Sequence, residues 1–332
     1  MKILITGASG FIGTNAIDHF ERKGHDLFNY SLHPPLDERQ KKYWHKGDIL
    51  DSTQTKATFQ EFQPDWVLHL AARAECDENT TVEQGYKVNI QGTKNVLDAV
   101  RATPSIVRVI ITSSQFVCRP GRLPKSDDDY FPETVYGQSK VFTEKLTLEA
   151  NLSSCWTIIR PTNIWGPWHM RYRREFWRVV QRGLYFHPGR QPVIRCYGYV
   201  KNVVDQIDRI FNAPVEKVNR QTIYLGDPPV DLYDWTNGFS RALVGHDVRV
   251  IPRSVMRLLA LIGDIPTVLL GRPFLINSSR FRSMTTDYET PMARTFQLLG
   301  ENPYNLDEGI SETVKWLQSY RGRDDNVNAG GF

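Results

Sequence analysis

The residues best suited to chemistry lie near the middle of the chain, in the run Tyr136-Gly137-Gln138-Ser139-Lys140. Tyr136 and Lys140 are four positions apart, so a helix would place them on one face, separated by about 6 Å of rise. A neighbouring ammonium stabilises a phenolate and lowers the pKa of the tyrosine. The pair therefore predicts a phenol that exchanges a proton with a substrate hydroxyl near neutral pH.

A cluster of hydroxyls, Thr112-Ser113-Ser114, closes an apolar run that predicts a strand. One of these serines could hydrogen-bond the substrate oxygen that gains or loses the proton. The plainer interpretation of the tyrosine and lysine is a pair on a surface helix. The hydroxyls at a strand end, together with the glycine turn described next, favour catalysis instead.

The N-terminus supplies the element that would hold a cofactor. Lys2–Thr6 reads as a buried strand, three glycines follow at positions 7, 10 and 13, and an apolar helical pattern then begins. Gly7 can adopt a tight turn with positive φ, Gly10 lets the backbone approach phosphates, and Gly13 lets the helix pack closely. The helix N-terminus favours an anion. This order predicts a dinucleotide site, although an ordinary tight turn could also contain such glycines.

Strand-like and helix-like segments alternate through the first half of the chain. This alternation predicts an α/β fold, a Rossmann-type doubly wound parallel sheet with a smaller α/β substrate-binding lobe. We predict strands at Lys2–Thr6, Asp26–Tyr30, Trp66–Leu70, Val107–Thr112, Trp156–Arg160 and Thr222–Leu225, with helices at Ile90–Ala102 and Tyr136–Asn151. The predicted domains are residues 1–162 plus about 200–227 for the dinucleotide, 163–199 plus 228–321 for the substrate, and a disordered tail at 322–332.

Composition and charge argue against nucleic-acid binding, metal binding and membrane insertion as functions of this chain. The 332 residues carry a net charge of +4, which does not argue for nucleic acid. The four cysteines are widely spaced, so we expect reduced thiols and no metal site in a cytoplasmic protein. The N-terminal apolar stretch is only a few residues long and is explained as a strand, so we expect no secretion signal. The apolar region Val255 to Ile276 is too interrupted to span a bilayer, which predicts no stable membrane insertion. A surface or interface helix from Ser254 to Ile262 is expected, with peripheral membrane contact as the alternative.

Across nearly its whole length the chain resembles an extended short-chain dehydrogenase/reductase, in the NAD-dependent epimerase/dehydratase family typified by UDP-galactose 4-epimerase. The order of several short motifs carries the resemblance. These motifs are the glycine turn from Thr6 to Gly13, Gly47-Asp48-Ile49, His69-Leu70-Ala71-Ala72, Val88 to Thr93, Thr112-Ser113-Ser114, Tyr136 to Lys140, and Arg160 to Pro167.

The resemblance implies roles for individual residues. Ser114, Tyr136 and Lys140 would form the catalytic set, and Asn163 and Arg195 would bind the diphosphate of a nucleotide-sugar. Arginines suit that task because guanidinium groups bind phosphate oxygens in pairs. Together with the glycine turn, the resemblance implies a cofactor site formed by Gly7, Gly10, Phe11, Ile12, Gly13, Ser31, Asp48, Ile49, Leu70, Ala71, Ala72, Asn89, Thr112, Tyr136, Lys140 and Pro161.

Some residues depart from the family pattern. Ser31 replaces the acid that would hold the ribose of NAD, and His33, Arg39, Lys41 and Lys42 follow it, which favours NADP over NAD slightly. Asp37 and Glu38 argue partly the other way.

Two further positions bear on the reaction. Gln115-Phe116 stand where dehydratases carry an acidic pair, which argues against dehydration. Cys118 and His169 could each act in proton transfer, but a packed thiol and a surface histidine are the simpler interpretations.

These features predict a nucleotide-sugar epimerase acting at C4 with bound NAD(P). The same residues would serve an NADPH-dependent reductase of a ketosugar or another carbonyl compound, and a silent NAD(P)-sensing protein is a third reading. The family commonly pairs two helices from each subunit. The resemblance therefore implies a homodimer through Ile90–Ala102 and Tyr136–Asn151, with a nucleotide-sugar as the small-molecule partner.

Overall fold

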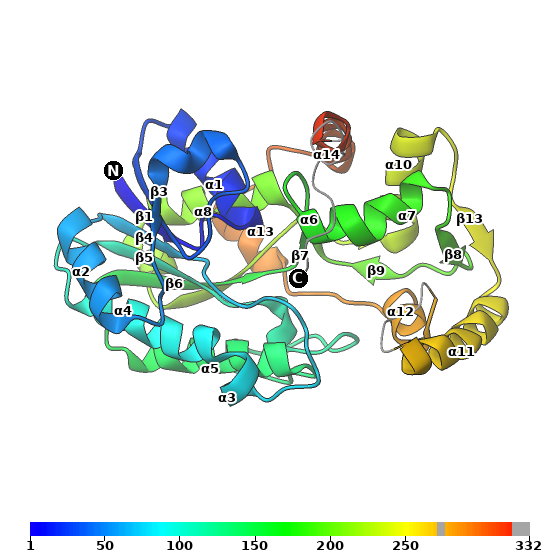
Figure 1. Ribbon diagram of the computed structural model, residues 1–332, viewed down its shortest axis with the longest axis horizontal. Helices are drawn as coiled ribbons and strands as arrows, with labels where there is room; N and C mark the ends of the chain where they lie inside the picture. Colours follow the sequence, from blue (N-terminus) through cyan, green and yellow to red (C-terminus); the bar gives the residue numbers. More distant parts are fainter. Residues whose placement is uncertain (271–275, 321–332) are drawn as a thin grey trace. The chain divides into compact units, whose positions relative to one another are not determined.

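A parallel sheet of seven strands forms the centre of the larger of two compact units (Figure 1). The computed structural model describes residues 1–270 and 276–320. The strand order is β11-β6-β5-β4-β1-β2-β3, and every neighbouring pair is parallel. The strands are β1 (Lys2–Thr6), β2 (Asp26–Ser31), β3 (Trp44–Lys46), β4 (Trp66–His69), β5 (Arg108–Thr112), β6 (Cys155–Pro161) and β11 (Gln221–Leu225).

The doubly wound fold predicted from the sequence is confirmed. The central strands are continuous apolar runs because helices cover both of their faces, and a buried parallel strand has no solvent side. Each predicted strand agrees with the structure within one residue at either end. The sequence reading missed β3, which is short and has two exposed residues, His45 and Lys46, so it carries no run of buried apolar residues.

Helices flank both faces of this sheet. In Figure 1, α1 and α8 lie on one side of the strands, and α2, α4 and α5 lie on the other. The helices of the larger unit are α1 (Phe11–Arg22), α2 (Ser52–Phe62), α3 (Val82–Gly85), α4 (Thr93–Arg101), α5 (Val135–Glu149), α8 (Val200–Asn212), α9 (Val215–Val218) and α13 (Ala293–Leu299). Short 3₁₀ turns η1 (Glu38–Tyr43) and η3 (Gln115–Val117), the π-helical turn η2 (Val88–Gly92) and strand β7 (Asn163–Trp165) complete it.

The boundary between the units differs from the predicted one. The larger unit contains residues 1–168, 198–227 and 290–304, so it retains the segment after Thr162 and also gains α13. Side-chain hydrogen bonds account for both additions. Asn15 Nδ2 of α1 donates to the carbonyl of Pro167 at 3.0 Å, and Thr295 Oγ1 of α13 donates to the carbonyl of Tyr224 at 2.7 Å. Such long-range bonds leave no trace in local sequence.

The second unit contains residues 169–197, 228–289 and the chain from 305 onward. It is built from short strands in pairs: β9 with β12 antiparallel, and β8 with β13 parallel. Helix α10 packs against α7 and α14, and α11 packs against α12. The elements are α6 (Met170–Tyr172), η4 (Arg173–Trp177), α7 (Arg178–Gln181), β8 (Phe186–Pro188), β9 (Ile194–Arg195), β10 (Tyr197–Tyr199) at the boundary, β12 (Val230–Asp231), α10 (Leu232–Val244), β13 (Arg249–Ile251), α11 (Arg253–Leu270), α12 (Ser278–Ser283) and α14 (Leu306–Tyr320).

Two sequence expectations concern the C-terminal part. The helix expected from Ser254 to Ile262 exists but is longer, because α11 continues past Pro266 to Leu270. The tail expected at 322–332 lies outside the described residues. Within the described parts of the chain, no helix is long and apolar enough to cross a membrane.

Candidate active site

The glycine turn between β1 and α1 has the close packing that its spacing predicts. Gly7 has φ +71°, and a Cβ there would lie 2.6 Å from the backbone nitrogen of Ala71 in the loop after β4. A Cβ at Gly13 would lie 2.3 Å from the Cα of Ala8. Any larger residue would therefore push apart the turn, the helix and the neighbouring loop. These two glycines bring α1 and the β4 loop together at the carboxyl edge of the sheet.

The N-terminus of α1 is open to an anion on electrostatic grounds. Gly10 is its N-cap and makes no side-chain cap, and the first turn contains no acidic residue. The first N–H groups of a helix have no partner within the helix and carry a partial positive charge. The turn is therefore suited to a pyrophosphate.

Ser31 ends β2, as predicted, but its hydroxyl faces the glycine turn. Its Oγ accepts a hydrogen bond from the backbone N–H of Ser9 at 3.3 Å and donates to Asn29 Oδ1 at 2.6 Å. Asn29 Nδ2 in turn donates to Ser9 Oγ at 3.1 Å. Ser31 thus braces the turn and supplies no negative charge at the end of the strand.

The cations after Ser31 are engaged with carboxylates. Arg39 forms an ion pair with Asp37 at 2.6 Å, Lys42 pairs with Glu21 at 2.7 Å, and Lys41 pairs with Glu38. These pairs neutralise the charges that favoured a 2′-phosphate in the sequence reading.

The residues predicted to line the adenine and ribose lie in neighbouring loops of the same unit. Ile49 is buried and packs so closely on Gly92 that a Cβ there would lie 2.4 Å from Ile49 Cδ1. Asp48 is half-buried, and its Oδ1 accepts from the N–H of Leu50 at 2.9 Å. Leu70 and Ala71 hydrogen-bond to Thr6 through their backbone nitrogens, and Ala72 follows them.

Asn89 is fully buried, and its amide is used within the protein. Its Oδ1 accepts from the N–H of Arg73 at 2.8 Å, and its Nδ2 donates to the carbonyl of Arg73 at 3.0 Å and to Ser139 Oγ at 2.9 Å. These bonds tie the loop after β4 to helix α5. The geometry therefore fits a residue that positions the cofactor loop.

Helix α5 carries the predicted catalytic pair. Thr134 caps its N-terminus by accepting from the N–H of Gly137 at 2.9 Å. Tyr136 and Lys140 are both buried on the face toward the sheet, with Lys140 Nζ 6.0 Å from the centre of the Tyr136 ring. Lys140 Nζ also donates to the carbonyl of Thr112 at 2.8 Å, which ties α5 to the end of β5. Ser114 lies two residues after the end of β5 and is buried.

The pKa of Tyr136 differs from the value expected from the sequence. Burial raises the pKa of Tyr136 above its ordinary value, and a hydrogen bond with Ser114 opposes this rise. Burial lowers the pKa of Lys140 to about 8, while the charge of Glu144 acts in the opposite direction. The expected lowering of the tyrosine pKa is absent because the loss of solvent outweighs the hydrogen bond with Ser114. Phenolate formation here needs a further positive charge.

Two buried hydroxyls at the carboxyl ends of β5 and β6 have no hydrogen-bond partner among the described residues: Thr112 Oγ1 and Thr162 Oγ1. Orphaned buried hydroxyls are uncommon in folded proteins because they lose their hydrogen bonds to water. They lie beside Pro161 and Lys140, where the sequence places the cofactor. The residues present therefore fit a dinucleotide, and Thr162 is a candidate contact that the sequence did not indicate.

A buried ion pair joins helix α5 to strand β6. Glu144 follows Lys140 by one turn and pairs with Arg160 of β6 at 2.8 Å, and each side chain is 1% exposed. Ser113 donates to Glu144 Oε1 at 2.5 Å, and Tyr130 donates to Oε2 at 2.9 Å. The sequence reading missed this group, although its signal was visible as a third polar residue at helical spacing after Tyr136 and Lys140.

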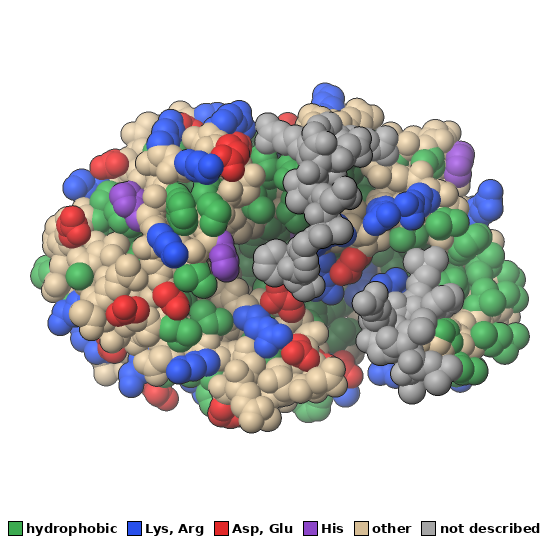
Figure 2. Space-filling view, viewed as in Figure 1, with side chains coloured by type: hydrophobic (Ala, Val, Ile, Leu, Met, Phe, Trp, Pro, Cys, Tyr) green, Lys and Arg blue, Asp and Glu red, His purple; other side chains and the backbone are tan. Residues whose placement is uncertain are grey.

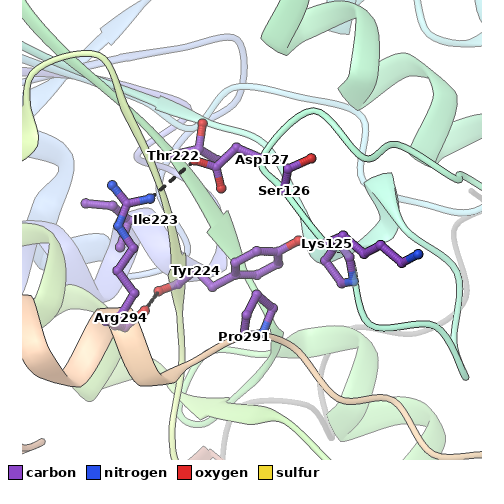
Figure 3. A pocket seen from close by; sticks show the side chains of 10 residues that line it. Lys125, Ser126, Asp127, Thr222, Ile223, Tyr224, Pro291 and Arg294 are labelled. Atoms are coloured by element: carbon purple, nitrogen blue, oxygen red, sulfur yellow. Dashed lines mark hydrogen bonds and ion pairs between the residues drawn. The ribbon is translucent and has the colours of Figure 1, made fainter.

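A pocket of about 410 Å³ lies along the edge strand β11 (Figure 3). Its wall includes Asp127 and Tyr224, and both contact the Arg160 guanidinium: the Asp127 carbonyl accepts at 2.5 Å, and the Tyr224 hydroxyl at 3.1 Å. Arg294 of α13 closes the pocket by pairing with Asp127 at 3.3 Å. None of the predicted catalytic or cofactor residues lines it.

The remaining candidates have local structural roles. Cys118 is a buried thiol whose Sγ approaches the Arg122 carbonyl at 3.5 Å, and burial raises its pKa, so it remains protonated. All four cysteines are free thiols. His169 caps α6, with Nδ1 accepting from the N–H of Tyr172 at 3.1 Å, and burial lowers its pKa to about 4. Cys118 agrees with the interpretation as a packed thiol, whereas His169 is half-buried and is not the surface histidine expected from the sequence.

The two predicted substrate residues lie in different units. Asn163 begins β7 of the larger unit and is half-buried. Arg195 belongs to β9 of the second unit, is 9% exposed and donates to the carbonyl of Ser283. Its Nε has no hydrogen-bond partner among the described residues. A buried guanidinium with a spare donor suits an anionic ligand.

The fold and this site define an NAD(P)-dependent short-chain dehydrogenase/reductase. The model of the NAD dependent epimerase/dehydratase family matches residues 3–226, and the chain belongs to this family.

The chain is similar to several curated proteins. It is 26% identical to an N-acetyl-alpha-D-glucosaminyl-diphospho-ditrans,octacis-undecaprenol 4-epimerase of Escherichia coli O157:H7, over 98% of this chain and 97% of that protein. It is 27% identical to a UDP-glucose 4-epimerase of Vibrio cholerae, over 95% of this chain and 94% of that protein. A 3-beta-hydroxysteroid dehydrogenase of Mycolicibacterium neoaurum is 27% identical over 61% of this chain, which spans only 58% of that relative.

Solved structures agree on the fold. The UDP-glucuronic acid 4-epimerase of Bacillus cereus, in complex with UDP-glucuronic acid and NAD, superposes with a TM-score of 0.70 at 18% identity, covering 96% of this chain and 99% of that one.

Proposed function

We propose that this protein is a 4-epimerase of diphosphate-linked sugars that works with tightly bound NAD. The observation that carries the proposal is that Lys140, one turn after Tyr136 on α5, reaches the end of β5 near Ser114. There burial raises the pKa of the Tyr136 phenol and Ser114 acts to lower it, and the hydroxyls of Thr112 and Thr162 have no hydrogen-bond partner among the described residues. Two relatives named as 4-epimerases match almost the whole chain and support this choice of reaction.

In the proposed reaction Tyr136 removes the proton of the C4 hydroxyl, and Ser114 hydrogen-bonds the same oxygen. NAD held at this site would supply the hydride chemistry at C4, and its positive charge would favour the phenolate. Lys140 would hold the ribose, and the glycine turn, Thr112 and Thr162 would position the rest of the dinucleotide. Tyr136 returns its proton at the end, so the cycle has no net oxidation.

The choice of dinucleotide follows from charge. Ser31 is bound to the glycine turn, and Arg39, Lys41 and Lys42 are each in an ion pair. A 2′-phosphate would have to compete with those carboxylates, so we propose NAD in place of the NADP favoured by the sequence.

The sugar carrier is proposed to be a nucleoside diphosphate, because the Nε of the buried Arg195 guanidinium has no hydrogen-bond partner among the described residues and suits that anion. A polyprenyl diphosphate sugar is the second candidate, because one full-length relative is named for such a substrate. The shared diphosphate is the group that a buried guanidinium recognises.

The test is to identify the nucleotide released from purified, denatured protein and to follow UDP-, GDP- and dTDP-sugars by NMR. Retained NAD and inversion at C4 are expected. Consumption of NADPH with a ketosugar and no retained cofactor would establish a reductase instead. Ligand-dependent partner binding without turnover would establish a sensor.

A matched variant tests the mechanism. Tyr136→Phe should lower kcat by about a hundredfold or more, as expected for removal of a general acid/base, while leaving cofactor retention unchanged. Unchanged turnover in this variant would refute the mechanism.

The predicted homodimer through α4 and α5 remains a proposal. Phe142 and Leu148 are exposed on α5 by 45% and 52% and would be covered in it. Light scattering of the wild type and of Phe142→Ser measures this directly.

A further inference from the structure

Helix α11 presents apolar side chains on two opposite faces. On one side Met256 and Ala260 are each 1% exposed, and Gly263 is buried with them. A helix of a globular protein usually has polar residues on the face opposite the buried one. Here the opposite face is also apolar, which normal folding within one chain does not explain.

The exposed face of α11 is continuous. Its six large apolar side chains are between 40% and 61% exposed: Val255, Leu258, Leu259, Leu261, Ile262 and Ile265. At 100° per residue these positions cover an arc of about 160°. Figure 2 shows hydrophobic side chains gathered at the edge of the molecule where α11 lies in Figure 1.

The charged residues in and near α11 are mostly positive. From Arg249 to Arg282 the sequence contains six arginines and a single acid, Asp264. That acid is used internally, because its carboxylate accepts from the N–H and the hydroxyl of Ser278 at 2.9 and 2.6 Å. Arg249, Arg257 and Arg282 are exposed, and none has an ion-pair partner among the described residues. On the helical wheel, Arg257 lies just beside the apolar arc.

We propose that α11 docks this protein on the surface of an anionic lipid bilayer. Leucine and isoleucine side chains on one arc would enter the boundary between headgroups and acyl chains, and Arg257 beside the arc would contact the negative headgroups. The helix lies in the plane of the interface and does not span it, in agreement with the finding that no described helix could cross a membrane. A protein partner would need acidic groups around an apolar groove, whereas an anionic bilayer supplies both features everywhere. This inference does not depend on the reaction proposed above.

The experiment is sedimentation of the full-length protein with vesicles of phosphatidylcholine alone or of phosphatidylcholine and phosphatidylglycerol in equal amounts. Binding to the anionic vesicles is expected, with weaker binding to the neutral ones and release at high salt. Leu258→Ser combined with Leu261→Ser should lower the partition coefficient at least about tenfold. Arg257→Gln should lower it about fivefold.

A control variant carries a leucine-to-serine substitution outside α11. Leu123→Ser removes a leucine that is 57% exposed, similar to the 59% and 55% of Leu258 and Leu261, and should leave vesicle binding unchanged. Retained NAD and an unchanged melting temperature show that each variant is folded. Absence of binding to anionic vesicles, or an equal loss in the Leu123 control, would overturn the proposal. Dissociation of an oligomer by the α11 variant without vesicle binding would identify a second copy of the chain as the occupant.

Discussion

The buried ammonium of Lys140 allows a stability prediction that is separate from catalysis. Lys140 is 4% exposed, and burial lowers its pKa from 10.5 to about 8. One pKa unit corresponds to about 1.4 kcal/mol, so keeping this amine charged in the fold costs about 3 kcal/mol. Replacing Lys140 with methionine, which has a similar length and no charge, removes that cost.

The sign of the pH dependence follows from linkage. The pKa of Lys140 is lower in the folded chain than in the unfolded chain, so the unfolded chain binds more protons between pH 8 and 10.5. Stability therefore rises with pH across this window, and the destabilising effect is complete below pH 8. Between pH 7 and pH 9.5 this single group should raise the free energy of unfolding by about 2 kcal/mol.

Urea denaturation of nucleotide-free protein at pH 7 and pH 9.5 measures this effect in the wild type and in Lys140→Met. The variant should lack the rise. At pH 7 it should be more stable by about 2 kcal/mol, because the lost hydrogen bond to the Thr112 carbonyl offsets about 1 kcal/mol. Lys145→Met, on the exposed side of the same helix, is the control and should keep the wild-type pH dependence. Equal rises in the wild type and Lys140→Met would refute the desolvation argument.

Three further predictions follow from single contacts. Glu144→Gln leaves the Arg160 guanidinium buried without its counter-ion and should lower the free energy of unfolding by about 3 kcal/mol, measured by urea denaturation against Glu149→Gln as an exposed control. Gly13→Ala places a Cβ 2.3 Å from the Ala8 Cα, so NAD retention and melting temperature should both fall; a variant that retains NAD fully would contradict the packing argument. His169→Ala removes the cap of α6 and should cost about 1 kcal/mol of stability with kcat unchanged, whereas a hundredfold loss of kcat would make His169 a proton carrier.

The parallel sheet and the residues at its carboxyl edge could be predicted from the sequence because short sequence motifs specify them. The glycine spacing, the apolar strands and the hydroxyls after β5 all act through backbone geometry within a few residues. The supporting bonds could not be predicted in the same way. Asn89 to Ser139 and Glu144 to Arg160 join residues 50 and 16 positions apart, and only the folded topology makes them neighbours.

Charge was the least predictable property of the site. The sequence shows three cations after Ser31 but does not show that each has a carboxylate partner, one of them Glu21 on α1. It also shows Lys140 one turn after Tyr136 without showing that both are withdrawn from water. Burial reverses the expected direction of the tyrosine pKa, and burial is a property of the whole fold.

Helix α5 is held by three groups of contacts at successive turns along one face, and this explains how the helix can place the Tyr136 phenol accurately. Tyr136 meets Ser114, Lys140 reaches the Thr112 carbonyl, and Glu144 binds Ser113 and Arg160. Positions four residues apart share one helix face, so these contacts fix both the height and the rotation of the helix against β5 and β6. Glu144 touches no reacting atom in this arrangement. It acts as a positioning residue, because loss of its contacts would free the helix to rotate and would move the Tyr136 hydroxyl away from Ser114.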